Sequence, residues 1–328
     1  MTADSGRAQR WFESNDLDRL LRPIYETLIA HGERVEPTRG ANRELRGVHL
    51  ELANPRARLS RSWFRGRAFS AVAEFVWYCS GSDVVSQMEA YTKGYGDHVG
   101  GQARQRGAYG PRLFGPTGQI EPLIESLRDH PSTRKAVVQL FDRDDLQNHT
   151  KDVPCTCTLQ FFVRNDTVEL HVHMRSNDAY LGLTHDVFCF TMIQEYVAAR
   201  LGFDVGAYVH TVGSLHLYET HIPEVEAYLH EGHLETASMQ PMPHNDPKAG
   251  LEWLTATESK LREGAGLDEL NAGYWSDLAT VLWLQLSADG DETAYEAARA
   301  RISTRYFDPY ISDKQIRQVR RAQRETSL

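Results

Sequence analysis

The sequence predicts an α/β protein with a mixed β-sheet and flanking helices, followed by a helical C-terminal extension. Apolar runs of strand length and helical stretches follow one another without strict alternation, which is typical of a mixed sheet. Beyond about residue 231 the composition shifts, and Pro241, Pro243 and Pro247 mark a linker before several amphipathic helices. A length of 328 residues allows about two domains, or one large α/β domain with an appendage.

The first third of the chain contains two predicted helices and one strand. Apolar residues recur at helical spacing over residues 11–31, and residues 36–40 then form a loop. Residues 48–52 alternate as a strand does, and residues 69–79 predict a buried helix. Residues 91–118 are dense in Gly and Arg, which suits an irregular active-site loop better than a core element.

The rest of the chain supplies the remaining sheet and the extension. Four apolar runs predict strands, and one helix lies between the last two: 136–141, 158–163, 168–174 and 208–212, with the helix at 186–201. Residues 248–328 predict amphipathic helices. We therefore expect an N-terminal helical segment at 1–38, a catalytic domain at 39–230 and an extension at 231–328.

Composition and charge exclude several classes of protein. Hydrophobic residues make up 41% and charged residues 25%, which fits neither a disordered nor a membrane-embedded chain. The N-terminal residues lack the apolar run of a signal peptide, so we expect a cytoplasmic protein. The net charge of −9 disfavours extended nucleic acid as a partner, although a small phosphate can still be held locally. The four cysteines are too few for a disulfide framework and are expected to be reduced.

Two cysteines lie at the start of the strand predicted at 158–163. Alternation places Cys155 and Cys157 on the same side of the chain, and two buried thiols acting as small hydrophobes are the simplest explanation. Pro154 changes that balance, because it ends the strand ladder where a thiol would face a cavity. Cys155 is therefore a candidate nucleophile.

The strand at 168–174 carries His171 and His173, with Arg175 on the same face. Two imidazoles could bind a metal with His185 or His216 as a third ligand, but the spacing alone is weak evidence. A cationic Arg175 would oppose a metal dication, whereas an arginine followed by Ser176 suits an oxyanion such as phosphate. We predict no metal site.

Four further residues carry candidate side chains. Asp186 directly precedes an apolar helix, where a capping role is the simplest explanation. His216 and Tyr218 alternate onto one strand face, either as half-exposed residues or as ligands of a sugar hydroxyl. Glu74 lies inside an apolar helix, so its carboxyl must be paired, hydrated or protonated, and it is a candidate general acid or base.

The predicted final helix presents a row of arginines. Arg317, Arg320, Arg321 and Arg324 share one face of that helix. A solvated surface is the expected explanation, and a partner-binding face is the alternative.

These clusters resemble the thymidylate synthase family in their order and nearly in their spacing, over roughly residues 39–230. No single motif is specific, but the set is. The motifs are Glu74-Phe75-Val76-Trp77, Ala108-Tyr109-Gly110, Pro154-Cys155, Gln160 to Val163, Arg175 to Leu183, His210 to Gly213 and His216-Leu217-Tyr218.

The resemblance implies the thymidylate synthase-like fold as a homodimer packed through its sheets, and a role for each matching residue. Cys155 would add to C6 of a pyrimidine nucleotide, and Glu74 and Tyr109 would organise water and proton transfer. The 5′-phosphate would be held by Arg39, Arg175, Ser176 and, from the neighbouring subunit, Arg134 and Lys135. His216 and Tyr218 would bind the sugar, and Asp178, Gly182 and Trp77 the folate.

Four departures from the family pattern sharpen the expected function. Asp186 stands where the synthases have Asn, and a carboxyl matches the hydrogen-bonding edge of cytosine, as in the family's cytidylate hydroxymethylases. Thr156 follows the nucleophile where the synthases have His, and Lys135 replaces the second arginine, which loses bidentate phosphate binding. The C-terminal extension has no match to the apolar tail that excludes water in the synthases.

The resemblance therefore implies a pyrimidine nucleotide 5-hydroxymethylase that acts on CMP or dCMP, with 5,10-methylenetetrahydrofolate as co-substrate. CMP is favoured, because the long extension resembles the hydroxymethylases of nucleoside-antibiotic biosynthesis. Three alternatives stay open: methylation of dUMP, a metal-dependent hydrolase using the histidines, and a non-catalytic nucleotide-binding dimer.

Overall fold

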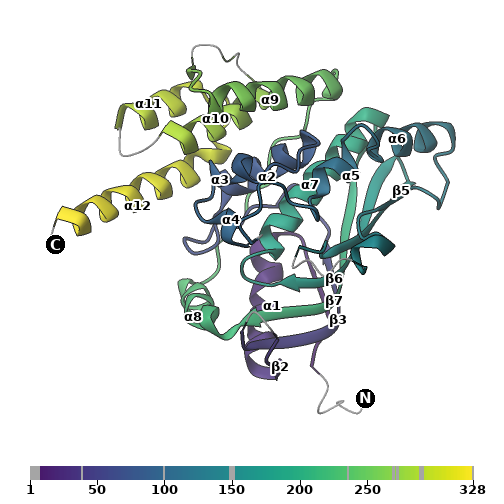
Figure 1. The fold of residues 1–328 in the computed structure, drawn as a ribbon, viewed down its shortest axis with the longest axis horizontal. Coiled ribbons are helices and arrows are strands. Elements are labelled where there is room, and N and C mark those ends of the chain that lie inside the picture. Colours follow the sequence, from purple (N-terminus) through teal and green to yellow (C-terminus); the bar gives the residue numbers. More distant parts are fainter. Residues whose placement is uncertain are drawn as a thin grey trace.

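A computed structural model describes residues 8–37, 40–98, 100–147, 152–234, 236–267, 270, 273–287 and 292–326. Its centre is a seven-stranded mixed sheet in the order β1-β3-β7-β6-β5-β4, with β2 paired to β3 (Figure 1). β1–β3 and β6–β7 are parallel pairs and the other pairs are antiparallel, which confirms the predicted class. The strands are β1 Trp11–Ser14, β2 Glu33–Val35, β3 Asn42–Leu52, β4 Val137–Gln139, β5 Thr156–Arg164, β6 Thr167–Asp178 and β7 Asp204–Tyr218.

Helices cover one face of this sheet in layers. α7 (Leu183–Leu201) packs on β6 and β7, α1 (Leu17–His31) packs on β3, and α2 (Ala68–Cys79) lies outside α7 (Figure 1). The predicted buried helix at 69–79 is thus confirmed. Both α2 and α7 are apolar on most sides, because each is covered by further helices.

The other face of the sheet is less covered among the described residues. Along β6, fully buried residues alternate with partly or fully exposed ones, and β5 shows the same alternation beyond its first residues. One face of each strand therefore lies in the helix-covered core while the opposite face stays accessible in the single chain.

The N-terminal segment differs from its prediction. Residues 11–31 do not form one helix, because β1 (Trp11–Ser14) pairs in parallel with β3 before Asp16 caps α1. Trp11 is 53% exposed and stacks on His49 with ring centroids 3.7 Å apart. Its apolar side chain fitted the helical stripe by coincidence.

Short helices lie near the predicted active-site loop at 91–118. α3 (Val85–Glu89) precedes the loop, α4 (Tyr95–His98) and α5 (Tyr109–Leu113) interrupt it, and α6 (Ile120–Asp129) follows it. The rest of the described loop is turns and irregular chain, as expected from its Gly content.

The C-terminal extension is helical, as predicted. It comprises α8 (Ile222–Glu231), which begins before the predicted boundary, and then α9 (Pro247–Arg262), α10 (Tyr274–Ser287), α11 (Glu292–Arg301) and α12 (Asp308–Thr326). α9 and α10 pack against α2, and one hydrophobic core runs from Leu20 to Leu282 without interruption. The boundaries at 38 and 230 stay predictions. None of the described helices is long and apolar enough to cross a membrane.

Candidate active site

Cys155 lies just before β5, on a loop held by Arg175 of β6. The Arg175 guanidinium donates to the carbonyls of Pro154 (2.8 Å) and Val153 (2.9 Å), and its Nη2 lies 3.7 Å from Cys155 Sγ. The Arg175 backbone N–H donates to the Cys155 carbonyl at 2.9 Å. A guanidinium beside a sulfur stabilises the thiolate, which is the nucleophilic form. No disulfide involves Cys155.

A β-bulge separates the two cysteines. The register of β5 against β6 shifts between Thr156 and Thr158, so Cys157 does not follow the simple alternation expected from the sequence. Burial raises the pKa of the Cys157 thiol, and Arg175 works against that rise. Burial therefore disfavours the thiolate form of Cys157.

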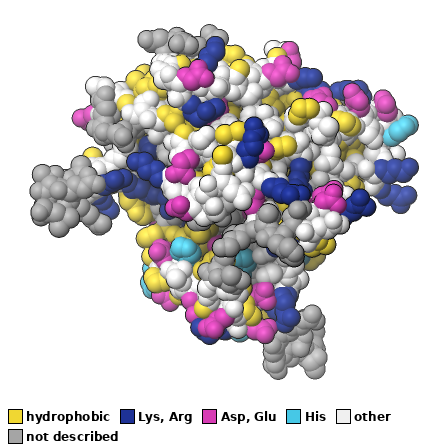
Figure 2. Space-filling model, in the orientation of Figure 1, with side chains coloured by type: hydrophobic (Ala, Val, Ile, Leu, Met, Phe, Trp, Pro, Cys, Tyr) yellow, Lys and Arg dark blue, Asp and Glu magenta, His cyan; other side chains and the backbone are white. Residues whose placement is uncertain are grey.

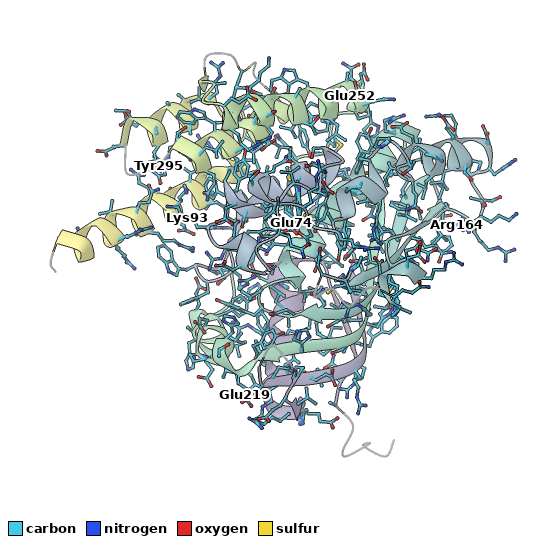
Figure 3. All side chains as sticks on the ribbon, in the orientation of Figure 1. Glu74, Lys93, Arg164, Glu219, Glu252 and Tyr295 are labelled. Atoms are coloured by element: carbon cyan, nitrogen blue, oxygen red, sulfur yellow. The ribbon has the colours of Figure 1, made fainter. Side chains whose placement is uncertain are left out.

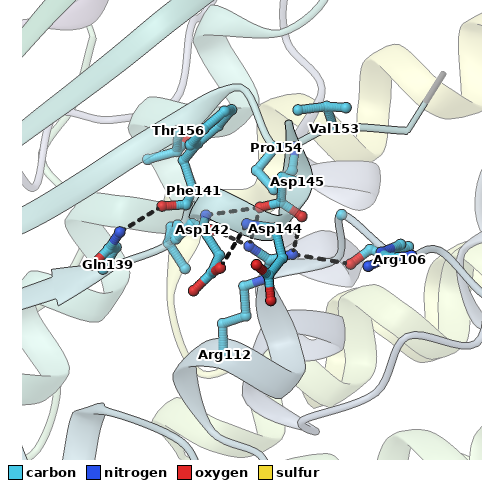
Figure 4. Close-up of polar contacts among 12 residues, drawn as sticks. Arg106, Arg112, Gln139, Phe141, Asp142, Asp144, Asp145, Val153, Pro154 and Thr156 are labelled. Atoms are coloured by element: carbon cyan, nitrogen blue, oxygen red, sulfur yellow. Dashed lines mark hydrogen bonds and ion pairs between the residues drawn. The ribbon is translucent and has the colours of Figure 1, made fainter. Parts of the chain in front are cut away.

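An ion pair between Arg112 and Asp145, with its hydrogen bonds, holds the chain next to the loop that carries Cys155 (Figure 4). Arg112 binds Asp145 through two hydrogen bonds, at 2.7 and 2.9 Å, and also donates to the carbonyls of Leu140 and Arg106. Leu140 in turn donates its N–H to the Cys157 carbonyl at 2.9 Å. Arg112 holds the pKa of Asp145 below its usual value, so the pair is ionised and rigid.

Tyr109 approaches the nucleophile loop from α5. Its hydroxyl accepts from the Thr156 backbone N–H at 3.1 Å and from Thr156 Oγ1 at 2.9 Å. Burial, with the charges of Asp186 and Cys155, raises the pKa of Tyr109 well above its usual value. The phenol therefore stays protonated and can donate its own proton to a ligand or water. Thr156, which the sequence marks as a departure, thus positions Tyr109.

Glu74 lies at the centre of the molecule in α2, far from the peripheral acids labelled in Figure 3. Its Oε1 accepts from the Tyr78 hydroxyl at 2.6 Å. Burial raises the pKa of Glu74 and the hydrogen bond from Tyr78 lowers it. None of the ion pairs among the described residues includes Glu74, so it keeps the raised pKa of a candidate acid or base.

Asp186 does not cap α7. The helix begins at Leu183 with Gly182 at the N-cap position, which leaves Asp186 inside the first turn. Its carboxyl is 9% exposed; burial, then repulsion from Glu74 and Asp178, raise its pKa well above the usual value, and a hydrogen bond with Asn177 opposes them. The capping explanation is wrong, and the side chain is a buried acid whose pKa is raised in part by the charge of half-buried Glu74.

The segment from Asp178 to Gly182 forms a tight turn beside Asp186. Asp178 Oδ1 accepts from the backbone N–H of Tyr180 (2.8 Å) and Leu181 (2.9 Å). At Gly182 a side chain would meet Asn177 Oδ1 at 2.9 Å and Asp186 Oδ2 at 3.4 Å. Gly182 therefore permits the close approach of the β6 end to Asp186.

His216 and Tyr218 lie together on β7, with ring centroids 5.2 Å apart at nearly right angles. His216 pairs in register with Asp178, and Ser214 pairs with Ser176. The β6 and β7 ends thus bring Ser176, Asp178 and His216 to one edge of the site.

Arg134 and Lys135 lie elsewhere. Both are exposed at the start of β4, where Gln160 donates to the Arg134 carbonyl at 3.1 Å. Gln160 is five residues along β5 from Cys155, roughly 17 Å at the rise of an extended strand. Within one chain these two residues are not brought to Cys155. Arg39 lies outside the described residues.

Trp77, one turn from Glu74, is almost completely buried, and its Nε1 is among the buried polar atoms without a hydrogen-bond partner in the described structure.

The histidines of β6 do not form a metal site with other described residues. His171 and His173 are on the accessible face of β6, and the His173 ring forms a hydrogen bond with the Thr211 hydroxyl at 3.0 Å. Among the described residues, no group of three His, Cys, Asp or Glu side chains is placed to hold a metal ion.

Three neighbours of the site were not singled out from the sequence: Tyr78, Asn177 and Arg65. Asn177 was within a quoted motif, but its contact with Asp186 depends on the turn at Gly182. Arg65 is 2% exposed, donates to Thr184 Oγ1 at 2.7 Å and lies over the Tyr180 ring at 4.3 Å. Only its position directly before the apolar helix α2 could have suggested it.

Comparison with known proteins agrees with this arrangement. The family model for thymidylate synthase matches residues 65–261, more than half of the chain. A deoxyuridylate hydroxymethyltransferase from Bacillus phage SP01 is 31% identical over 225 residues, 63% of this chain and 58% of that protein. A thymidylate synthase from Listeria monocytogenes serovar 1/2a is 31% identical over 111 residues, 34% of this chain and 35% of that protein.

Among solved structures, the fold is similar to thermostable thymidylate synthase A from Bacillus subtilis. The TM-score is 0.57 at 21% sequence identity, over 67% of this chain and 86% of the other. The matched part of the chain spans between about a third and three fifths of the length of the curated relatives above. The family model covers more than half of the chain, and the fold is similar to that of a thymidylate synthase: the chain belongs to the thymidylate synthase family.

Proposed function

We propose that this protein transfers a one-carbon unit to C5 of a cytidylate, CMP or dCMP, and releases the 5-hydroxymethyl nucleotide. The observation that carries the proposal is Asp186, a buried carboxyl whose pKa is raised well above its usual value by burial and by repulsion from Glu74, which favours the protonated form. A protonated carboxyl donates to N3 of neutral cytosine and accepts from its N4 amino group. Neutral uracil presents a donor at N3 and an acceptor at C4, which mismatches that pattern.

Cys155 supplies the nucleophile in this proposal. Its thiolate, stabilised by Arg175, forms a bond to C6, and the electron pair of the C5–C6 double bond makes C5 nucleophilic. C5 then bonds to the one-carbon unit and loses its proton. After the carrier leaves, water adds to the exocyclic methylene, and the bond between Cys155 and C6 breaks.

Glu74 and Tyr109 move and hold protons. Burial raises the pKa of Glu74, which suits a carboxyl that takes up and releases protons, and Tyr109 keeps a donor available because its phenol stays protonated. Thr156 occupies both lone pairs of the Tyr109 oxygen, which points the phenolic proton away from β5.

The phosphate is held by Arg175 and Ser176 with Arg39, and by Arg134 and Lys135 of the partner subunit. Two features support a sheet-packed homodimer: the sheet face opposite the helices is accessible in one chain, and Arg134 lies far from Cys155 of its own chain. A local cationic site is needed in a protein of net charge −9.

The one-carbon donor proposed is 5,10-methylenetetrahydrofolate, as a co-substrate. Asp178 and the Gly182 turn would bind the pterin of this co-substrate, and Trp77 would line the pterin site. One observation supports a polar group there: Trp77 Nε1 is buried without a hydrogen-bond partner among the described residues, whereas the space beside Gly182 is taken by Asn177 and Asp186. When bound, the co-substrate supplies the one-carbon unit.

A second candidate is hydroxymethylation of deoxyuridylate. The phage relative bears that activity in its name, which supports a hydroxymethyl product and a uracil base. The two candidates differ only at the base edge that Asp186 would face. The pathway that uses the product stays a prediction.

Base preference is the deciding experiment. We expect tritium release from 5-tritiated CMP or dCMP to exceed that from dUMP, and Asp186→Asn to lower kcat/KM for cytosine nucleotides while raising it for uracil ones. Each mismatched group costs about 1–3 kcal/mol, or roughly ten- to a hundredfold. An unchanged ratio of cytosine over uracil nucleotides would remove the cytidylate proposal.

The nucleophile has a matched control two residues away. Cys155→Ala should abolish turnover while nucleotide binding persists, and Cys157→Ala should stay active. Near-native product formation by Cys155→Ala would overturn the covalent mechanism.

Subunit mixing tests the shared phosphate site. Arg134→Ala and Cys155→Ala subunits should each be inactive alone, and a heterodimer should regain one working site. No regained activity in verified heterodimers would contradict sharing across the interface.

A further inference from the structure

The extension contacts the predicted active-site loop at 91–118 through one buried carboxylate, Glu258 of α9. Glu258 Oε1 accepts from the Tyr91 hydroxyl at 3.0 Å, and Glu258 Oε2 accepts from Gln87 Nε2 at 2.9 Å. Arg262, one turn further along α9, donates from Nε to Glu258 Oε1 at 2.7 Å. Both oxygens of this carboxylate are therefore occupied, and two of these three partners lie outside the extension.

The burial of Glu258 distinguishes it from a surface acid. Charged side chains of both signs are spread over the face of the molecule that Figure 2 shows, but Glu258 is 1% exposed. A buried carboxylate is costly unless a cation and hydrogen bonds compensate it. Arg262 supplies the cation from the same helix, and this pair needs no partner in the loop. The bonds to Gln87 and Tyr91 are what Glu258 adds beyond its own helix.

A second contact from the extension fixes the same tyrosine. Gln285 of α10 donates from Nε2 to the Tyr91 backbone carbonyl at 2.8 Å, and Lys314 of α12 donates to Gln285 Oε1 at 2.6 Å. Tyr91 is buried, and the extension holds both its side chain and its backbone. Three helices of the extension, α9, α10 and α12, therefore contribute to the position of one loop residue.

The position of Tyr91 determines that of Tyr95, four residues further along the chain. Glu89 of α3 binds the segment between them, because its carboxylate accepts from the N–H groups of Gly94 at 2.7 Å and Gly96 at 2.8 Å. These bonds tie residues 91–96 into one hydrogen-bonded piece with the end of α3. A displacement of Tyr91 would therefore also move Tyr95.

Tyr95 connects this segment with the candidate active site. Its ring packs edge-on against Trp77, with ring centroids 5.7 Å apart and ring planes at 85°, and its hydroxyl donates to Gln105 Oε1 at 2.9 Å. Burial is the main reason that the pKa of Tyr95 is raised, and the charges of Glu74 and Asp186 add to the rise. Tyr95 thus lies near both candidate acids and against the tryptophan between α4 and the core.

We propose that Glu258 and Gln285 are positioning residues: they hold Tyr91, and through it the Tyr95 ring that packs on Trp77. This inference rests on the proposed function, in which Trp77 lines the pterin site. The extension, which lies beyond the predicted boundary at 230, thereby sets the affinity for the one-carbon donor. The nucleotide would be bound by the ends of β6 and β7, so its affinity does not depend on Glu258.

Steady-state kinetics of the full chain test this role. Glu258→Gln keeps the size of the side chain but places an amide NH2 group among hydrogen-bond donors, so it should raise the KM for 5,10-methylenetetrahydrofolate about tenfold. Tyr91→Phe removes one bond, adds no polar group and should raise that KM about threefold. In both variants kcat and the KM for the nucleotide should stay within about twofold of wild type.

Hydrogen exchange measured by mass spectrometry reports on the loop without turnover. In Glu258→Gln the backbone amides of residues 91–96 should exchange about tenfold faster, while those of β6 and β7 keep their wild-type rates. Tyr274→Phe is the matched control, because it removes a buried hydroxyl of the same extension that lies 3.8 Å from Met192 Sδ. That variant should change neither the KM values nor the exchange of residues 91–96.

Several results would overturn the positioning role. Unchanged exchange of residues 91–96 in folded Glu258→Gln is one, and an unchanged co-substrate KM in an active Glu258→Gln or Tyr91→Phe is another. An equal rise in both KM values, or the same change in Tyr274→Phe, would indicate a merely structural role. Tyr91→Phe decides the question in the same way where Glu258→Gln does not fold.

The two measurements separate this inference from the proposed function. If wild type releases no tritium from any pyrimidine nucleotide but residues 91–96 exchange faster in Glu258→Gln, the proposed function fails and the hold of Glu258 on the loop stands. If turnover occurs and the co-substrate KM is the same in wild type and Glu258→Gln, the function stands and the positioning role fails.

Discussion

Helix α7 carries two buried carboxylates whose surroundings differ completely. Asp186, in the first turn, faces Glu74 and Asp178, and its pKa is raised. Glu195 accepts from Arg56 at 2.6 Å, from Arg58 at 2.5 Å and from the Met242 N–H at 3.1 Å. Burial works to raise the pKa of Glu195, but Arg58 and Arg56 hold it below its usual value. Two buried carboxyls of one helix therefore have pKa values shifted in opposite directions, one toward the neutral acid and the other toward the anion.

This difference distinguishes a carboxyl suited to proton transfer from one that stabilises the fold. The Glu195 carboxylate lies between two arginines that keep it ionised, so it is not suited to proton transfer. It binds α7 to the loop at Arg56 and to the linker at Met242. A buried neutral acid beside a second acid can donate and take up protons, which is costly for stability and useful at a site. The comparison predicts opposite responses when each carboxyl is replaced by its amide.

The largest effect is expected at Glu195. Glu195→Gln leaves Arg58, which is completely buried, without its anion, and should lower the free energy of unfolding by about 3–5 kcal/mol. Urea denaturation followed by circular dichroism measures it. Glu121→Gln is the control, because its pair with Arg200 is partly exposed and should cost about 0–1 kcal/mol. A loss of under about 1 kcal/mol in Glu195→Gln would break the comparison.

Asp186 should respond in the opposite direction and depend on pH. Its folded pKa is raised above the unfolded value of 3.8, so its contribution to stability is present below pH 3.8 and is lost as pH rises toward the folded pKa. The loss is about 1.4 kcal/mol per pH unit over that window. Asp186→Asn should therefore match wild type at low pH and be the more stable protein at pH 8. Denaturation curves across pH 4–8 that stay parallel would contradict the raised pKa.

Tyr78 gives the smallest effect. Its hydroxyl lowers the pKa of Glu74 through the 2.6 Å hydrogen bond, so Tyr78→Phe should raise that pKa further. The pH–activity profile should shift upward on the limb that reports Glu74, by up to about one pH unit. Tyr95→Phe removes a hydroxyl bonded to Gln105 and serves as the control. Identical profiles for wild type and Tyr78→Phe would exclude Glu74 as the group that titrates.

Much of the fold followed from local patterns, and the failures have physical causes. α2 was predictable because its apolar residues are continuous, and the strands because their runs are bounded by turn residues. β1 was missed because it is only four residues long, and its Trp11 has the helical spacing of the apolar residues that follow it in α1. Its pairing with β3 is a long-range contact that no local pattern encodes.

The sequence indicated the motifs of the candidate site, but it did not indicate the hydrogen bonds and contacts that connect them. Cys155, Arg175 and Tyr109 lie around one loop, as the resemblance implied. The position of Asp186 inside the helix depends on Gly182, and the contact of Arg317 with Trp63 depends on how the extension packs. The roles of individual residues stay predictions until the variants are measured.

The continuous core has a consequence for how this chain can vary. Glu258 of α9 accepts hydrogen bonds from Gln87 and Tyr91, and Tyr274 of α10 contacts Met192 of α7. A cut between catalytic part and extension would expose the apolar sides of α2 and α7 to water. The extension, residues 231–328, is thus part of the same folding unit as the sheet, and we expect evolution to remodel it residue by residue rather than exchange it between relatives as a separate domain.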